Sequence, residues 1–224
     1  MDKPEEERFR KIERFAAAAL LCGTTLFTCV LALSRWPRWW ELILPELSPM
    51  GWMESLLLYT VALTGFLCAL LCYLRNDSAG FKLWGLFGLG FILLSLDERL
   101  AVHERLRDGI LAPAKLKVPL FFWTDYGDFI LLLVLVIGLI FGVKIIRLFR
   151  RRQSAFRWFL AAAAFSVAAV LMDSFSYYGY SIDIQRLEQF IEELFEVGAM
   201  LSFFNAAFFM FMHYLREILG PSHP

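Results

Sequence analysis

The sequence predicts an all-α membrane protein built as a bundle of six transmembrane helices. Hydrophobic residues make up 59% of the chain, and the mean hydropathy of +0.58 is above the usual range of soluble proteins. Six apolar stretches approach or exceed the ~20 residues that a helix needs to cross a bilayer core. Tryptophan and tyrosine residues flank several of these stretches, as they do at the level of the lipid headgroups.

Each stretch predicts one helix, and the third continues beyond its apolar part as a polar helix. The expected spans are 15–33, 53–74, 81–96, 129–149, 158–177 and 190–215. Residues 15–217 therefore form one transmembrane domain. Residues 1–14 are strongly charged and predict a short amphipathic helix on the cytosolic surface, and residues 218–224 predict a cytosolic tail. The first apolar run is too long for a signal peptide and lacks a cleavage site, so it predicts a retained span.

Lysine and arginine set the expected orientation, because they are enriched in cytoplasmic loops. With the N-terminus inside, the inner segments contain fourteen of these residues and the outer segments eight. The run Arg150, Arg151 and Arg152 is the strongest anchor, and it is also a possible contact for anionic lipid. The sequence thus predicts a multi-pass protein of the cell's inner (plasma) membrane with both termini in the cytoplasm. The 22 basic and 22 acidic residues balance, which gives no indication of nucleic-acid binding.

In this topology, acidic residues from three spans face the outer leaflet together. Carboxylates at membrane depth are costly unless they are paired, protonated or bound to a cation, so they are candidate functional residues. The candidate ligands, with one histidine, are Asp97, Glu98, His103, Glu104, Asp173, Glu192, Glu193 and Glu196.

Helical geometry, at ~100° per residue, predicts which of these side chains share a face. Asp97 and Glu104 fall on one stripe of the third helix, while Glu98 and His103 diverge to opposite sides. One site would therefore use either Glu98 or His103, unless the helix bends. The four acids of the sixth span fall on one broad face and would repel each other, so they require neutralisation; these are Glu188, Glu192, Glu193 and Glu196.

Three further acids on the same side have a simpler explanation. Glu54 opens the second span, and Asp125 and Asp128 precede the fourth. Acidic residues are common at helix N-termini, where they cap free backbone N–H groups. We therefore expect Glu54→Gln to leave a metal site intact.

Three interpretations of the acids remain open. The first is a divalent metal site, for which Mn, Fe, Zn and Ca are all suitable ions. The second is proton or cation transport, since pumps and exchangers use intramembrane acids. The third is a structural network in which nearby arginines pair with the acids.

The small number of histidines limits the kind of metal site that the chain can form. The chain contains only His103, His213 and His223, and the latter two are expected on the inner side, which excludes a three-histidine zinc site at the acids. A metal held by carboxylates would activate water or polarise a carbonyl or phosphoryl oxygen. Hydrolysis of a lipid or envelope substrate is then the expected chemistry if the protein is an enzyme, which the sequence leaves open.

Two short motifs carry a family resemblance. Leu96-Asp97-Glu98 is followed by His103-Glu104, and Glu192-Glu193-x-x-Glu196-x-Gly198 opens the sixth span. This combination resembles uncharacterised multi-pass bacterial membrane proteins with a paired acidic signature. The resemblance covers two of the six spans, and it implies no activity.

Overall fold

The computed structural model describes residues 3–45, 47–121, 123–124, 126–127, 129–174 and 179–219. The described part is helical, without strands, and six of its helices are long and apolar enough to cross a membrane. These are α1 (Lys3–Ser34), α2 (Pro49–Leu74), α3 (Ser78–Leu100), α5 (Phe129–Phe149), α6 (Gln153–Asp173) and α7 (Ile182–Leu219). The predicted fold class is confirmed.

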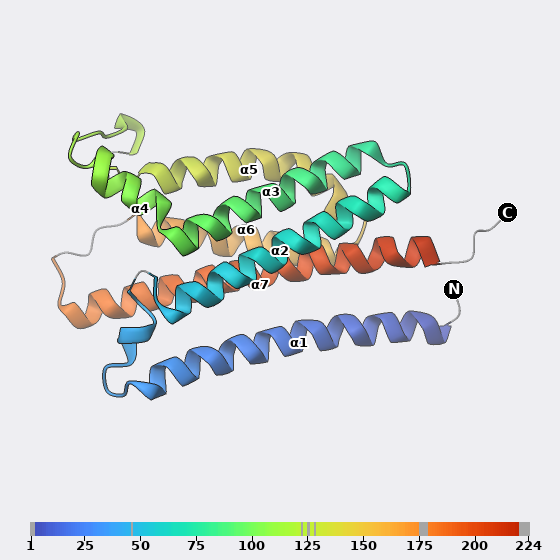
Figure 1. Ribbon diagram of the computed structural model, residues 1–224, viewed down its shortest axis with the longest axis horizontal. Coiled ribbons are helices and arrows are strands. Elements are labelled where there is room, and N and C mark those ends of the chain that lie inside the picture. Colours follow the sequence, from blue (N-terminus) through green and yellow to red (C-terminus); the bar gives the residue numbers. More distant parts are fainter. Residues whose placement is uncertain are drawn as a thin grey trace.

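The helices run side by side with alternating direction, so the bundle has two distinct ends (Figure 1). We call the end where α2 and α7 begin and α3 and α6 end the acid end. The opposite end, which contains the turns 75–77 and 150–152 and the starts of α3 and α6, is the basic end. α1 begins and α7 ends at the basic end (Figure 1).

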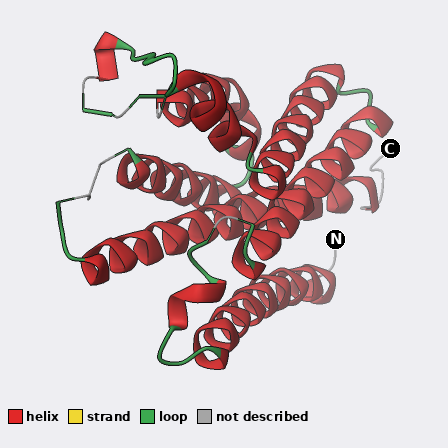
Figure 2. Cartoon of the chain, turned by 60° about the vertical axis from the view of Figure 1, so that its left-hand side comes forward, coloured by secondary structure: helices red, strands yellow, loops and turns green. Residues whose placement is uncertain are grey.

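Four short helical segments lie at the acid end. They are η1 (Trp39–Leu42), α4 (Val102–Leu106), the π-helical turn η2 (Arg107–Leu111) and η3 (Pro119–Phe121). Figure 2 shows that the segment between α4 and α5 projects beyond the start of α5.

The observed helices are mostly longer than the predicted spans. The 129–149 span matches α5 in both bounds, whereas α7 extends past its predicted span at both ends. α6 ends at Asp173, and residues 175–177 of its predicted span lie outside the described residues. Helical hydrogen bonding continues past the apolar stretch because a helix does not need an apolar sequence once it leaves the hydrocarbon.

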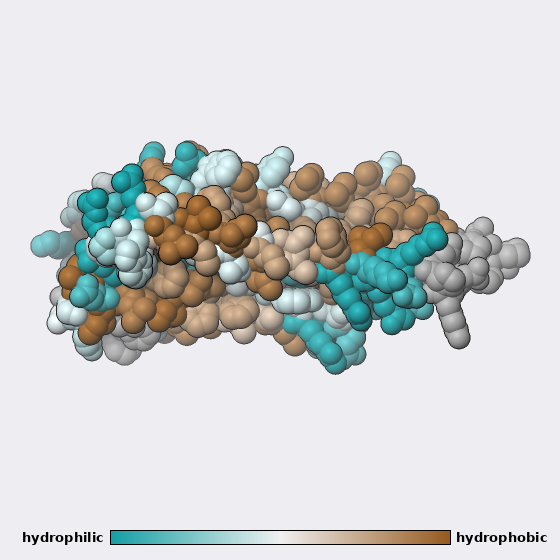
Figure 3. Space-filling model, turned by 90° about the horizontal axis from the view of Figure 1, so that it is seen from below, coloured by the Kyte–Doolittle hydropathy of each residue, from teal (hydrophilic) through white to brown (hydrophobic). Residues whose placement is uncertain are grey.

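The first helix differs most from expectation. Residues 3–14 are not a separate surface helix, because they form the first turns of a continuous α1. Glu13, within this charged stretch, is only 4% exposed. Seen from the side on which α1 lies, hydrophobic residues occupy the middle of the molecule and hydrophilic residues gather toward both ends (Figure 3).

The core of the bundle lies among α2, α3, α5, α6 and α7 and includes several aromatic side chains. Trp84 is fully buried and its Nε1–H donates to the Tyr214 hydroxyl at 3.2 Å, as buried tryptophan usually requires. α2 and α3 approach closely where Gly65 meets Gly88, since a Cβ atom on Gly65 would lie 3.3 Å from the Gly88 backbone. Small residues permit this kind of contact between membrane helices.

Defined caps set where two of the helices begin. The Ser48 hydroxyl accepts hydrogen bonds from the backbone N–H groups of Met50 and Gly51, and Pro49 occupies the first position of α2. Asp77 caps α3 in the same way through Gly80. Serine, aspartate and a first-turn proline are the residues that helix starts prefer.

Candidate functional site

Glu54 is a deeply buried carboxyl group at the acid end. It is 1% exposed, and its Oε1 has no hydrogen-bond partner among the described residues. Ser48 supplies the cap of α2, so Glu54 lies more than one turn inside the helix and faces the neighbouring helices. The expectation that Glu54 has a capping role is therefore wrong.

Glu54 from α2 meets Glu193 and Glu196 from α7. Each of the three offers a carboxylate oxygen, and these oxygens all lie within 4.8 Å of one another. The Glu54 carboxyl group also has a side-chain hydrogen bond with Glu193. Carboxyl groups this close cannot all carry an unscreened charge, so they share a proton or a cation.

Glu98 brings a fourth carboxyl group to the same place from α3. Its Oε1 lies 3.1 Å from where a Cβ atom would be on Gly51, and it interacts electrostatically with Glu54. The absence of a side chain on Gly51 lets Glu98 approach the α2 backbone one turn before Glu54. We call Glu54, Glu98, Glu193 and Glu196 the carboxylate cluster.

The predicted continuous third helix is interrupted, and the interruption decides where the histidine lies. α3 ends at Leu100, and Ala101 adopts left-handed angles of φ 48° and ψ 48° before α4 begins. Asp97 accepts a hydrogen bond from the backbone N–H of His103 at 2.8 Å and contacts its Nδ1 at 2.8 Å. Aspartate side chains compete with helical bonding by capturing a nearby backbone N–H in this way.

The break separates the partners of Glu98 and His103. The turn at Ala101 folds His103 back onto Asp97. Glu98, which precedes the turn, interacts with Glu54 instead.

His103 is surrounded by acids from its own segment and from α6. Burial alone would lower its pKa, but the hydrogen bond and charge of Asp97, together with the charges of Glu104 and Asp173, raise the pKa above its usual value. We call Asp97, His103, Glu104 and Asp173 the histidine group. Glu192 connects this group with the carboxylate cluster, because it interacts electrostatically with Asp173, Glu193 and Glu196.

The structure thus places all eight sequence-predicted residues at the acid end, seven in two adjoining groups and Glu192 between them. Sequence reasoning missed Glu54. The pair Ser48-Pro49 was the available signal, because a serine followed by proline marks a helix start and puts Glu54 well inside the helix. Asp125 and Asp128 lie outside the described residues.

Two arginines at the acid end form ion pairs with acidic residues. Arg107 Nε contacts Asp108 at 2.8 Å, and an Arg107 nitrogen lies 4.0 Å from Glu104. Arg186 pairs with Asp183 at 3.5 Å and stacks on the Trp40 ring. The charges that act most strongly on Glu54, by contrast, are those of three other carboxyl groups.

At the basic end, two of the three consecutive arginines form ion pairs with acidic residues of the protein. Arg151 pairs with Asp77 at 3.3 Å, and Arg152 pairs with Glu13 at 2.6 Å. Arg150 is exposed and its guanidinium lies 5.7 Å from the centre of the Phe156 ring. We expect a lipid phosphate at this run to contact Arg150 first.

Comparison with known proteins identifies a family without an assigned activity. A family model for a domain of unknown function, DUF8692, matches residues 26–211, and the chain belongs to this family. No curated protein and no solved structure matched the chain.

Proposed function

We propose that this member of a family of unknown function is an inner (plasma) membrane protein whose carboxylate cluster binds a divalent cation. Glu54 carries the proposal, because its buried Oε1 lacks a hydrogen-bond partner among the described residues while its carboxyl group lies next to Glu193 and Glu196. With both termini in the cytoplasm, as the lysine and arginine distribution favours, the cluster lies on the side of the outer leaflet.

The separation of the oxygens suits a cation. Two oxygens bound to the same Ca²⁺ at ~2.3–2.6 Å lie at most about 5 Å apart, and the three oxygens are all within 4.8 Å. A smaller ion such as Mn²⁺, Fe²⁺ or Zn²⁺ requires the oxygens to be closer. Carboxylate ligands favour Ca²⁺ or Mn²⁺, whereas Zn²⁺ or Fe²⁺ would favour recruitment of the His103 imidazole.

The histidine group supports a hydrolytic role for the site. Asp97 holds Nδ1 of His103, which leaves Nε2 to take a proton from water, as in other histidine–carboxylate pairs. The hydroxide oxygen would bond to the carbonyl or phosphoryl centre of a lipid or envelope substrate, and the ester bond would break. The proton on Nε2 would then pass to the departing oxygen. A bound divalent cation would supply Lewis acidity at the substrate oxygen.

The test is metal content by plasma mass spectrometry on detergent-purified protein. We expect about one equivalent of a divalent metal per chain after loading, and loss of that metal in Glu54→Gln and Glu193→Gln, because each removes a ligand charge. Asp183→Asn is the matched control, since Asp183 lies in the first turn of α7 with its side chain 88% exposed. Metal retained equally in all four proteins would place the ion elsewhere.

Absence of metal from the loaded parent would overturn the proposal and favour one of two other functions. A proton- or cation-coupled transporter would show ion flux in proteoliposomes that Glu54→Gln abolishes. A structural cluster would show no flux, and the same substitution would change only the thermal stability.

A further inference from the structure

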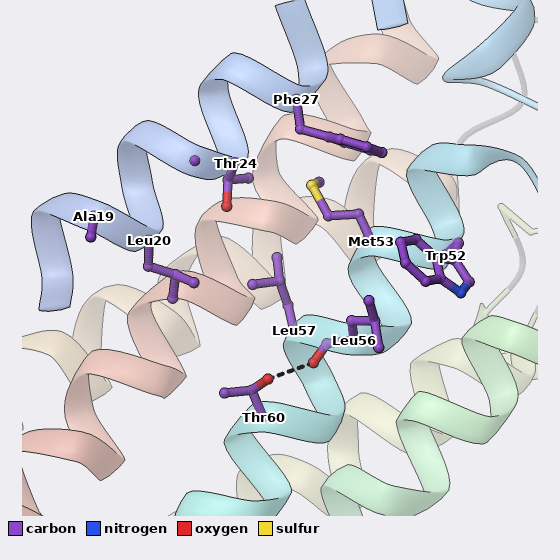
Figure 4. A pocket seen from close by; sticks show the side chains of 10 residues that line it. Ala19, Leu20, Thr24, Phe27, Trp52, Met53, Leu56, Leu57 and Thr60 are labelled. Carbon is purple, nitrogen blue, oxygen red and sulfur yellow. Dashed lines mark hydrogen bonds between the residues drawn. The ribbon is translucent and has the colours of Figure 1, made fainter. Parts of the chain in front are cut away.

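A groove runs between α1 and α2 in the half of the bundle nearer the acid end. Its volume is about 300 Å³, at the lower end of pockets that hold small ligands, ~300–1,000 Å³. The lining residues are Ala19, Leu20, Gly23, Thr24, Phe27, Trp52, Met53, Leu56, Leu57 and Thr60. Figure 4 shows side chains from the two helices facing each other across this space.

The groove lies between two attachments of α1 and is open where α1 carries small residues. At the basic end, Glu13 accepts hydrogen bonds from Arg152 at 2.6 and 2.7 Å and from Arg216 at 2.7 Å. Toward the acid end, the Thr28 hydroxyl contacts the Met50 sulfur at 3.8 Å. Between these attachments, a Cβ atom on Gly23 would meet nothing within 4 Å.

The groove has few polar groups that could form hydrogen bonds with water. Eight of its ten lining residues are apolar, and the Thr60 hydroxyl donates to the Leu56 carbonyl at 2.8 Å within its own helix. Both flanking helices are long and apolar enough to span a membrane, so the medium beside the groove is lipid hydrocarbon. Apolar cavities without polar partners exclude water and bind apolar molecules.

We propose that this groove binds one acyl chain of a membrane lipid whose headgroup lies at the acid end. Ala19 and Phe27 are eight residues apart, so the groove extends ~12 Å along α1. This length is close to half of a ~30 Å hydrocarbon core, as one chain of a single leaflet requires. Trp52, which is 51% exposed, lies in the first turn of α2, at the depth where tryptophan contacts headgroups.

The test uses the full chain, stripped of lipid in detergent and titrated with dioleoyl phosphatidylethanolamine under native mass spectrometry. Gly23→Phe would place a ring at the groove, where an added Cβ atom meets nothing within 4 Å. Gly138→Phe is the matched control, because Gly138 is an exposed glycine within the spanning helix α5, where an added Cβ atom would also meet nothing within 4 Å. We expect the first lipid to bind the parent and Gly138→Phe with the same Kd and Gly23→Phe at least about fivefold more weakly.

A lipid that carries a diazirine on its acyl chain provides the second measurement, in nanodiscs. We expect its crosslinks in the parent to concentrate on the groove residues of α1 and α2. Equal lipid binding by the parent and Gly23→Phe, or crosslinks spread evenly over the bundle, would overturn the proposal. Dimerisation of the parent that Gly23→Phe abolishes, without a change in lipid binding, would overturn it as well and assign the groove to a second copy of the chain.

Discussion

Ala101 shows how one residue changes the composition of the site. Its left-handed backbone ends α3 and lets His103 turn back onto Asp97. A left-handed conformation costs an L-residue roughly 1–2 kcal/mol, so the hydrogen bonds of Asp97 to the His103 backbone and ring help to offset this cost. The break is therefore part of the site, because it positions His103 against Asp97.

Glycine at this position should therefore stabilise the protein. Ala101→Gly removes the left-handed strain, and the greater chain entropy of glycine offsets part of that gain, which leaves about 0.5–1 kcal/mol. We expect an unfolding temperature about 1–4 °C higher in detergent, with unchanged metal content. Ala101→Val should lower the unfolding temperature, because a branched side chain disfavours the conformation. An unchanged temperature in both variants would contradict the assigned backbone.

At the scale of the element, α1 depends on its attachment at the basic end. Its face toward lipid is largely exposed, and Glu13 is the buried charge that links it to Arg152 and Arg216. Arg152 also donates to the Phe209 carbonyl at 2.7 Å. This clamp joins α1 to the start of α6 and to α7, which are distant in sequence.

Removing the charge of Glu13 should destabilise the folded protein. Glu13→Gln leaves two partly buried guanidinium groups without their carboxylate, a change that typically costs about 3–5 kcal/mol. We expect the unfolding temperature to fall by roughly 10 °C. Glu6→Gln is the control, because Glu6 pairs with Arg10 on the exposed surface and such pairs contribute little. A similar effect of both substitutions would show that α1 is held by apolar contacts instead.

At the scale of the whole molecule, polar groups are sorted to the two ends. The carboxylate cluster and the histidine group lie at the acid end, and the ion pairs of Asp77, Glu13 and Glu217 lie at the basic end. Such sorting matches a bilayer, in which charge is tolerated at the surfaces and expensive between them.

Labelling with a membrane-impermeant maleimide on intact cells should report this orientation. The four native cysteines would first be replaced by alanine; they are Cys22, Cys29, Cys68 and Cys72. We expect Asp183→Cys, at the acid end, to react from outside, and Ser78→Cys, at the basic end, to react only after permeabilisation, since arginine-rich loops stay in the cytoplasm. The opposite pattern would reverse the proposed topology.

Much of the fold and part of the site followed from the sequence. Hydropathy and length determine which segments are able to span a membrane, because the bilayer imposes the same ~20-residue requirement on every helix. Alternation of the spans then placed Asp97, Asp173 and Glu193 at one end without knowledge of any contact. These are properties of separate segments, so one sequence is sufficient to predict them.

Tertiary structure alone decided which acids meet. Glu54 joins Glu193 and Glu196 because α2 presents that face to α7, and the sequence does not specify how far a helix is rotated about its axis. The backbone turn at Ala101 returns His103 to Asp97. Rotation and local breaks are determined by packing against neighbouring helices, so they emerge only when the whole bundle is assembled.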